Sequence, residues 1–199
     1  MLLLANILAA VAEIMGLYAN SHQLLHVIKR KTTKGVSGWA WTLSVGGNMA
    51  WTVYGVQHKI IALVVANAFL VGIGLLMLSR LYRDEGQRNK MILYACGVGL
   101  GLSCMFVYSR ELSGWLALIF GTLARLPQLY RAEKDKNLQG LSFTAQVLFF
   151  VENTLTFIYS LLLMAWPLLI AASIGVVSSG YIVLKVAKKG RNDYYKHKK

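Results

Sequence analysis

The chain is poor in charge, proline and cysteine. Charged residues make up 15% of its 199 residues, against about 25% in a typical soluble domain, and hydrophobic residues make up 56%. With a mean hydropathy of +0.52, this composition excludes a disordered chain and argues against a soluble globular one. The two cysteines, Cys96 and Cys104, are too few for a disulfide framework and lack the spacing of a zinc site. We expect them to be inert packing residues within a helix.

Motifs that carry chemistry are also missing. The sequence has no nucleotide-binding motif, catalytic triad or cluster of metal ligands. His22 and His26 lie one helical turn apart, but no third ligand is spaced to complete a metal site. We therefore expect no enzyme activity, no cofactor and no metal.

What the chain has instead is a series of apolar stretches. A bilayer core of about 30 Å needs about 20 helical residues to cross it. In the first stretch Ala10-Val11-Ala12 is similar to a signal-peptide cleavage site. No positive region precedes it, however, and the apolar run continues to Val27, so we expect an uncleaved span. The predicted spans are residues 2–28, 38–56, 60–79, 91–108, 112–130, 142–163 and 166–185.

The basic residues predict the orientation of these spans. Of the 21 Lys and Arg residues, 18 fall in the segments after spans 1, 3, 5 and 7, which all lie on one side of the membrane. Only Lys59 and Arg110 lie on the other side. By the positive-inside rule the N-terminus is outside and the C-terminus is cytoplasmic. The net charge of +13 then reflects topology and attraction to an anionic inner leaflet, and we expect no nucleic-acid binding.

The sequence repeats itself at an offset of 105 residues. A run of matches at one offset, without a gap, indicates an internal repeat rather than chance. The matching pairs include Gly16 and Gly121, Gln23 and Gln128, Gly35 and Gly140, Ser37 and Ser142, Asn48 and Asn153, and Tyr54 and Tyr159.

Each copy of the repeat contains three predicted helices, with the fourth span between the copies. A three-helix unit starts and finishes on opposite sides, so the extra helix gives the second copy the same orientation as the first. We therefore predict an all-α integral membrane protein of seven transmembrane helices, arranged 3+1+3 as two parallel three-helix-bundle repeats. The bundles are residues 1–83 and 111–188, joined by a linker and fourth helix over 84–110 and followed by a basic cytoplasmic tail over 189–199.

Several segments carry a family resemblance. RLPQLY over residues 125–130, followed by a charged loop and Gly140-Leu141-Ser142, resembles a PQ-loop motif, and the first repeat resembles a degenerate copy with His22 in place of the proline. NMAWTVYG over residues 48–55 resembles the second-helix signature of SWEET and SemiSWEET sugar transporters, and Asn67 resembles their third-helix asparagine. The resemblance covers nearly the whole chain. Cystinosin-type amino-acid exporters and KDEL receptors share this architecture.

The candidate binding residues are polar groups in the second and third spans. Trp51 lies near mid-membrane, although Trp prefers the interface, and an indole suits stacking on a sugar ring. Asn67 and Asn48 offer donors and acceptors for hydroxyl groups, unless they serve only to hold helices together. In the second repeat Asn153 is kept and Thr156 replaces the tryptophan, so we expect an asymmetric substrate site.

Charged residues within the spans are the second set of candidates. Glu13 shares a helix face with Gly16 and Asn20, and that face should point into the bundle or a cavity. Glu13 is then a gate, a proton-titrating carboxylate, or the partner of a donor on a neighbouring helix. Arg125 either snorkels to lipid phosphate or pairs at a cytoplasmic gate.

Pro127 is expected to act as a hinge in the fifth span, because proline removes a backbone hydrogen bond and kinks a helix. The first repeat has no equivalent proline. With Pro127 we group the remaining gating or hinge candidates, which are Gln128, Gln23, Tyr54 and Tyr159.

The sequence and the resemblance together predict a transporter for a small polar solute, most simply a sugar, which binds near the midplane between the bundles and moves by alternating access. This is facilitated diffusion. A proton-coupled amino-acid transporter and a KDEL-receptor-like cargo receptor are the alternatives. The sequence leaves a homo-oligomer open, and its short loops favour a bacterial inner membrane.

Overall fold

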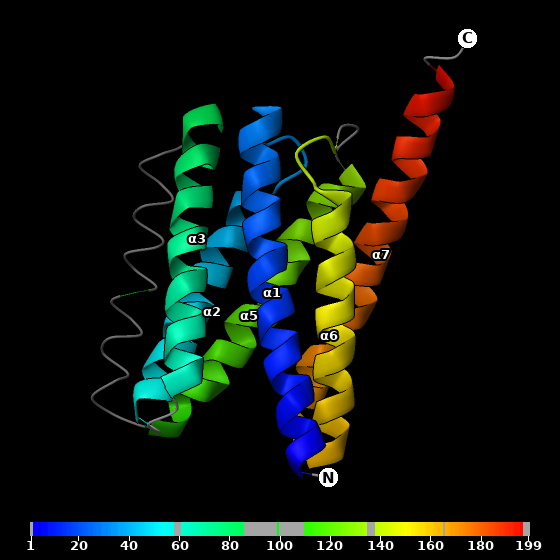
Figure 1. Cartoon of the computed structure of the whole chain (residues 1–199). Coiled ribbons are helices and arrows are strands. Elements are labelled where there is room, and N and C mark those ends of the chain that lie inside the picture. The colour runs from blue at the N-terminus through cyan, green and yellow to red at the C-terminus, as the bar shows by residue number, and fades with distance from the viewer. Residues whose placement is uncertain are drawn as a thin grey trace. The chain divides into compact units, whose positions relative to one another are not determined.

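The computed structural model describes residues 2–57, 61–85, 99, 110–134, 138–164 and 166–196, and these are helical apart from short turns, with no strand among them. Figure 1 shows the helices along the chain. They are α1 (Leu2–Arg30), α2 (Gly38–Gln57), α3 (Ile61–Glu85), α5 (Arg110–Lys134), α6 (Phe143–Leu163) and α7 (Trp166–Lys196).

The six helices correspond to six of the seven predicted spans. The predicted fourth span, residues 91–108, lies outside the described residues apart from Gly99, as do Cys96 and Cys104. Windows long and apolar enough to cross a membrane occur, in the described part of the chain, in three helices: Val64–Arg83, Phe143–Leu162 and Leu169–Lys189. The spanning role of the other helices, the total of seven and the orientation of the termini stay predictions.

The surface of these helices is that of a chain surrounded by lipid. Large apolar side chains are widely exposed, among them Val177 at 74% and Leu184 at 71% of their full area. In water, contiguous apolar exposure of this kind is uncommon, because it forfeits the burial that drives folding. In a bilayer the same exposure carries no such penalty, because lipid surrounds the apolar side chains.

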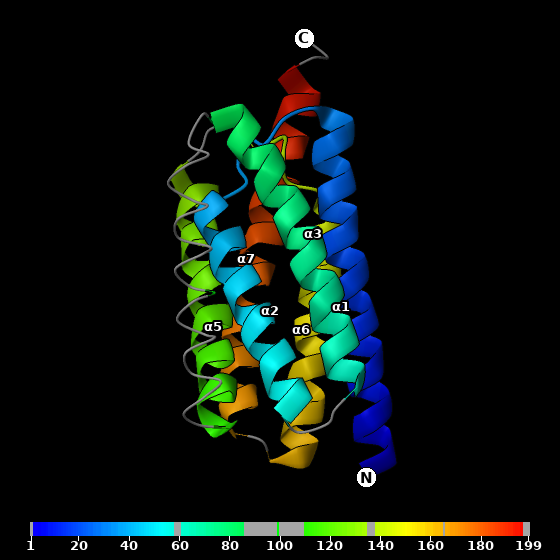
Figure 2. The same cartoon turned by 90° about the vertical axis from the view of Figure 1, so that its left-hand side faces the viewer.

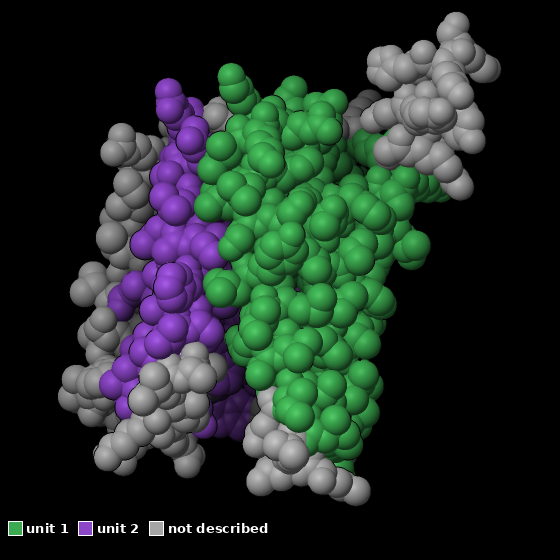
Figure 3. Space-filling view, in the orientation of Figure 1, with its two compact units in different colours: residues 1–36, 129–199 green, residues 37–128 purple. Residues whose placement is uncertain are grey.

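The helices form two compact units, coloured separately in Figure 3. Unit 1 comprises residues 1–36 and 129–199, and unit 2 comprises residues 37–128. Unit 1 therefore contains α1, α6 and α7, whereas unit 2 contains α2, α3 and most of α5. The units do not coincide with the two repeats, because each unit contains helices from both of them. The predicted repeat boundaries stay predictions.

Within unit 1, α1 packs against α6 and α6 packs against α7, as Figure 1 shows. A side chain added at Gly180 would lie 3.2 Å from the ring of Phe150, so this glycine lets α7 approach α6 closely. Within unit 2, α2 packs against α3, as Figure 2 shows. Val45 of α2 fills the space above Gly74 of α3, where any larger side chain would collide with it.

Two short turns precede α2 and α6 and set where these helices begin. Ser142 is the N-cap of α6, and its Oγ accepts a hydrogen bond from the backbone N–H of Ala145 at 3.2 Å. Ser37 does the same for α2 by accepting from the N–H of Ala40 at 3.3 Å. The turn before α2 contains Gly35 at φ 86°, a left-handed conformation that favours glycine. Both helix starts thus follow from residues that the repeat places at equivalent positions.

Candidate functional site

Gln23 ties the turn before α6 to α1 in unit 1. Its amide Nε2 donates to the carbonyl of Gly140 at 2.7 Å, and its Oε1 accepts from the backbone N–H of Ser142 at 2.9 Å. Only 2% of the Gln23 side chain is exposed, and Ser142 is equally buried. Buried polar groups need such partners, so Gln23 satisfies a backbone donor and a backbone acceptor at the start of α6.

Gln128 has the equivalent role in unit 2. Its Oε1 accepts from the backbone N–H of Ser37, at the start of α2, at 2.9 Å. Gln23 and Gln128, like Ser37 and Ser142, are 105 residues apart. Each repeat therefore supplies a glutamine that binds the turn of the other repeat.

Position 140 requires glycine because the backbone of Thr33 and Lys34 lies close to it. Its N–H donates to the carbonyl of Lys34 at 2.8 Å. A Cβ at Gly140 would lie 2.7 Å from that same oxygen and 2.8 Å from the carbonyl carbon of Thr33. The turns before α2 and α6 thus need glycine at equivalent positions for two different reasons, φ at Gly35 and space at Gly140.

The two histidines of α1 also contact this turn. The Nδ1 of His22 lies 2.9 Å from the Oγ of Ser142, and the Nε2 of His26 donates to the carbonyl of Gln139 at 3.0 Å. Their role in the structure is to hold the turn before α6. No group of three or more possible metal ligands occurs among the described residues.

The binding candidates of the first repeat lie in unit 2. Trp51 is half-buried and packs with Met49, Leu116 and Phe120 against the buried pair Ala50 and Ala117. Ala50 belongs to α2 and Ala117 to α5, and their small side chains let these two helices approach closely.

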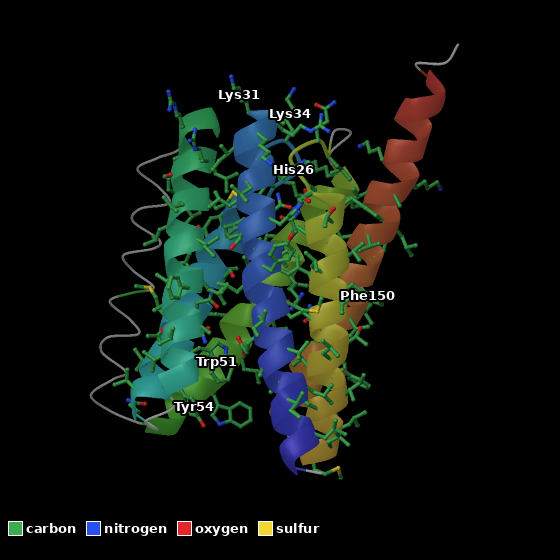
Figure 4. The ribbon with its side chains drawn as sticks, viewed as in Figure 1. His26, Lys31, Lys34, Trp51, Tyr54 and Phe150 are labelled. Carbon is green, nitrogen blue, oxygen red and sulfur yellow. The ribbon has the colours of Figure 1, made fainter. Side chains whose placement is uncertain are left out.

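Trp51 and Tyr54, labelled in Figure 4, form an edge-to-face pair with ring centroids 5.6 Å apart and an interplanar angle of 89°. Asn67 of α3 is buried, with 4% of its side chain exposed, and Asn48 is half-buried. The structure therefore places Trp51 beside Tyr54 as an aromatic pair.

The binding candidates of the second repeat lie in unit 1, on α6. Asn153 is buried and its Nδ2 donates to the carbonyl of Phe149 at 2.5 Å. The hydroxyl of Thr156 donates to the carbonyl of Glu152 at 2.9 Å. Tyr159 is half-buried one turn further along. Asn153 and Thr156 thus each direct a donor to the backbone of their own helix, as polar groups in membrane helices commonly do.

Glu13, Gly16 and Asn20 differ in exposure along α1. Gly16 is buried, Asn20 is half-buried and Glu13 is exposed. The Nδ2 of Asn20 donates to the carbonyl of Gly16 at 2.8 Å. Glu13 lies close enough to Tyr159 to act on it electrostatically. The face of α1 that carries these three residues is therefore directed only in part toward the neighbouring α6.

Pro127 lies inside α5, one residue before the boundary between the two units at Gln128 and Leu129. Arg125 is half-buried two residues earlier. The predicted hinge thus coincides with the point where the chain passes from one compact unit into the other. Lys59 and the side chain of Arg110, the two basic residues predicted on the outer side, lie outside the described residues.

Sequence reasoning missed an exposed cluster where α5 meets α7 in unit 1. Glu133 forms an ion pair with Lys185 at 2.5 Å and accepts a hydrogen bond from the hydroxyl of Tyr181. The hydrogen bonds from Lys185 and from Tyr181 lower the pKa of the Glu133 carboxyl below its ordinary value. The ammonium of Lys185 also lies 5.4 Å from the centre of the Tyr181 ring. Nothing in the spacing of these residues predicts the cluster, since Glu133 is about 50 residues from the others.

Two family models match the chain, one in each half. The model described as sugar efflux transporter for intercellular exchange matches residues 4–82, and the PQ loop repeat model matches residues 110–169. The second range includes Pro127, Gln128 and the turn before α6. The two matches, together with the fold, support a PQ-loop, SWEET-like membrane protein.

The fold is similar to that of a eukaryotic SWEET transporter determined at 3.7 Å resolution. The TM-score is 0.65 at 15% sequence identity, and the match covers 94% of this chain and 99% of that one. No curated protein matches the chain.

Proposed function

We propose that this protein is a sugar transporter that works by facilitated diffusion. The observation that carries the proposal is the match of residues 4–82 to the sugar efflux transporter family, because this range includes both Trp51 and Asn67. The buried amide of Asn67 and the aromatic pair of Trp51 and Tyr54 support it, since sugars offer hydroxyl groups and an apolar ring face. The family consists of transporters, and we propose no catalytic activity.

The roles of the residues follow from their chemistry. Trp51 stacks on the sugar ring, and the amide groups of Asn67, Asn48 and Asn153 exchange hydrogen bonds with its hydroxyls. Thr156 offers only a small hydroxyl in place of a second indole. The site is therefore asymmetric, with the aromatic surface contributed by the first repeat alone.

Transport proceeds in this proposal by alternating access. Pro127 provides the hinge, because it removes a hydrogen bond from α5 where the chain passes between the compact units. Gln128 and Gln23 hold the turns that start α2 and α6 during the movement, and Tyr54 and Tyr159 act as equivalent gates. Arg125 serves at the cytoplasmic end of the path.

Counterflow in proteoliposomes tests the proposal. Vesicles preloaded with an unlabelled sugar should accumulate the same labelled sugar transiently and saturably, while empty vesicles and vesicles loaded with an unrelated polar solute should not. The absence of counterflow across a panel of mono- and disaccharides, with protein that is monodisperse in detergent, would overturn it.

One observation favours a proton-coupled amino-acid transporter as the second candidate. Glu13 of α1 and Glu152 of α6 both act electrostatically on Tyr159, so unit 1 contains two carboxylates and a phenol close together. Acidic residues within membrane spans often carry protons. Under this function amino-acid uptake rises with an inward proton gradient, and Glu13→Gln abolishes that response.

The family match and the apolar helices support an integral membrane protein. We infer from its short loops that it resides in a bacterial inner membrane, with its basic segments against an anionic inner leaflet. A homo-oligomer is compatible with this placement.

A further inference from the structure

The two histidines of α1 contact the turn before α6 through different ring atoms. The Nδ1 of His22 lies 2.9 Å from the Oγ of Ser142, and the Nε2 of His26 lies 3.0 Å from the carbonyl oxygen of Gln139. Both histidines are half-buried, and all four residues belong to unit 1. The contacts are one helical turn apart on α1, but a hydroxyl and a carbonyl differ in what they can donate and accept.

The hydroxyl group that faces His22 already has one role. The Oγ of Ser142 caps α6 by accepting from the backbone N–H of Ala145 at 3.2 Å. Ser142 is 1% exposed, so its hydroxyl hydrogen needs an acceptor within the protein. The Nδ1 of a neutral imidazole is an acceptor, and it lies within hydrogen-bond distance. The contact is therefore complete when the hydroxyl donates to Nδ1 and the neutral His22 carries its hydrogen on Nε2.

Protonation changes the two histidine contacts in different ways. In a positively charged imidazole both nitrogens are donors. The Nδ1 of His22 then donates to Oγ instead, which leaves the hydroxyl hydrogen of the buried Ser142 without this acceptor. The carbonyl of Gln139 can only accept, so it receives a hydrogen from the Nε2 of His26 before and after protonation. The contact of His22 thus depends on a neutral imidazole, whereas that of His26 does not.

The elements packed against His22 supply few titratable groups. α6, which packs against α1, has none from Phe143 to Val151. The turn over residues 138–142 contains none, and Asp135 and Lys136 before it lie outside the described residues. On α1 itself, the ring of Tyr18 makes an edge contact with the imidazole, with ring centroids 6.2 Å apart. Beyond His26 the helix ends in Lys29 and Arg30, and Glu133 at the end of α5 is paired with Lys185.

The equivalent position in the second repeat does not titrate. The residue 105 positions after His22 is Pro127, whose side chain has no ionisable group. The turn before α2 is held in unit 2 by Gln128, which accepts from the N–H of Ser37 and keeps its charge at any physiological pH. A titratable group therefore holds one of the two equivalent turns and not the other.

We propose that His22 is a pH-sensitive switch at the start of α6. Its neutral imidazole accepts from the capping hydroxyl of Ser142, and its protonation loosens the turn before α6 from α1. Histidine side chains in general change charge between about pH 5 and pH 8, so the contact is present at the upper end of this range and is lost as the pH falls. The inference goes beyond the proposed transport function and does not depend on it. In the predicted orientation the turn lies at the cytoplasmic end, and the pH that acts on it is that of the cytoplasm.

Hydrogen exchange of the full chain in detergent, followed by mass spectrometry, tests the proposal. The measured segment is residues 138–146, which contains the turn and the start of α6. Wild-type protein is compared with His22→Asn at about pH 7.5 and about pH 5.5. The Oδ1 of asparagine is an acceptor that does not titrate, and it lies at a similar distance from the backbone as Nδ1. Because the substitution is outside the measured segment, the chemical exchange rate cancels at each pH.

The two proteins should exchange at similar rates at the higher pH. At the lower pH the segment should exchange at least about fivefold faster in the wild type than in His22→Asn, since a buried hydroxyl then lacks its acceptor. His26→Gln is the matched control, because its Nε2 is a donor to the carbonyl of Gln139 at either pH. The ratio of the His26→Gln rate to the wild-type rate should therefore be the same at both pH values.

Ser142→Asp should reverse the sign of the response. Aspartate also caps helices, and its carboxylate accepts from a protonated imidazole more strongly than from a neutral one. Relative to the wild type, the segment in this variant should become better protected as the pH falls. A contact that serves only for packing would not show this reversal.

Two outcomes overturn the inference. One is a ratio of wild-type to His22→Asn exchange that is the same at both pH values. The other, which decides if His22→Asn does not fold, is a ratio of Ser142→Asp to wild-type exchange that does not fall with the pH. Neither result bears on sugar transport, and a failure of counterflow leaves the role of His22 standing.

Discussion

The side-chain oxygen of Gln23 accepts a hydrogen bond from the backbone N–H of Ser142, 119 residues further along the chain, at 2.9 Å. The same glutamine donates to the carbonyl of Gly140, so one buried side chain satisfies the turn that starts α6. The turn that starts α2 is bound by Gln128 in the same manner. The PQ-loop glutamines thus have a structural role, and each links a helix of one repeat to a turn of the other by hydrogen bonds.

Removal of the Gln23 side chain should destabilise the protein. Gln23→Ala leaves the N–H of Ser142 and the carbonyl of Gly140 without this partner inside the protein, and an unsatisfied buried group costs about 1–3 kcal/mol. We expect a lower melting temperature in detergent, which is measured by size-exclusion chromatography after heating. Gln139→Ala, at an exposed position whose backbone carbonyl is kept, is the control. Equal melting temperatures for the two variants would contradict a stabilising role of the Gln23 side chain.

Gly140→Ala, in the turn before α6, should be more damaging than a glycine-to-alanine change within a helix. The new Cβ would lie 2.7 Å from the carbonyl oxygen of Lys34, which is backbone and cannot rotate away. The turn must therefore shift, which breaks the hydrogen bond from Gly140 to Lys34.

Gly72→Ala is the matched control for Gly140→Ala, because no atom lies within 4 Å of the position its Cβ would take. Alanine is favoured over glycine within a helix by about 1 kcal/mol, so Gly72→Ala should be neutral or stabilising. Thermal unfolding of both variants gives the comparison. A Gly140→Ala protein as stable as Gly72→Ala would show that the turn tolerates the clash.

The ion pair of Glu133 with Lys185 predicts a pH dependence with a definite sign. The pKa of Glu133 is lowered in the folded protein, so its ionised form stabilises the fold. This contribution is present above the ordinary pKa of 4.5 and is lost as the pH falls through the lower folded value.

The effect should be small, because both side chains are substantially exposed. We expect the melting temperature of the wild type to exceed that of Glu133→Gln slightly at about pH 6, and the difference to vanish in acid below the lowered pKa of Glu133. A difference that grows as the pH falls would assign the opposite sign to the interaction.

Trp51 and Asn67 should be essential for transport and dispensable for insertion. Trp51→Ala removes the stacking surface, and Asn67→Ala removes the amide, so each should reduce sugar counterflow at least about tenfold, the equivalent of about 1.4 kcal/mol in transition-state stabilisation. Trp51→Phe should retain part of the activity because it keeps an aromatic face. Trp39→Ala changes an exposed indole on the same helix and is the control. Normal counterflow by Trp51→Ala and Asn67→Ala would place the binding site elsewhere.

Hydropathy predicted the helices well and their ends less well. α2 and α6 match their predicted ranges to within a residue or two, because capping serines and glycine-containing turns bound them. α7 was predicted to end at residue 185 and runs to Lys196. An apolar run marks only the part of a helix that lipid surrounds, and Lys and Ala continue a helix readily in water.

The repeat offset predicted equivalent positions but not their partners. The spacing of Gln23 and Gln128 indicated a shared role, whereas the reciprocal hydrogen bonds to Ser142 and Ser37 depend on how the helices pack. Glu152 shows the same limit. The sequence places it beside Asn153, but only the packing of α6 on α1 brings its carboxylate against Gly16.

Sugar counterflow by the reconstituted wild-type protein, with and without an inward proton gradient, tests the central claim most directly. The account predicts saturable exchange of a neutral sugar at the same rate under both conditions, because facilitated diffusion draws only on the gradient of the solute. Amino-acid uptake that depends on the proton gradient, with no sugar exchange, would contradict it.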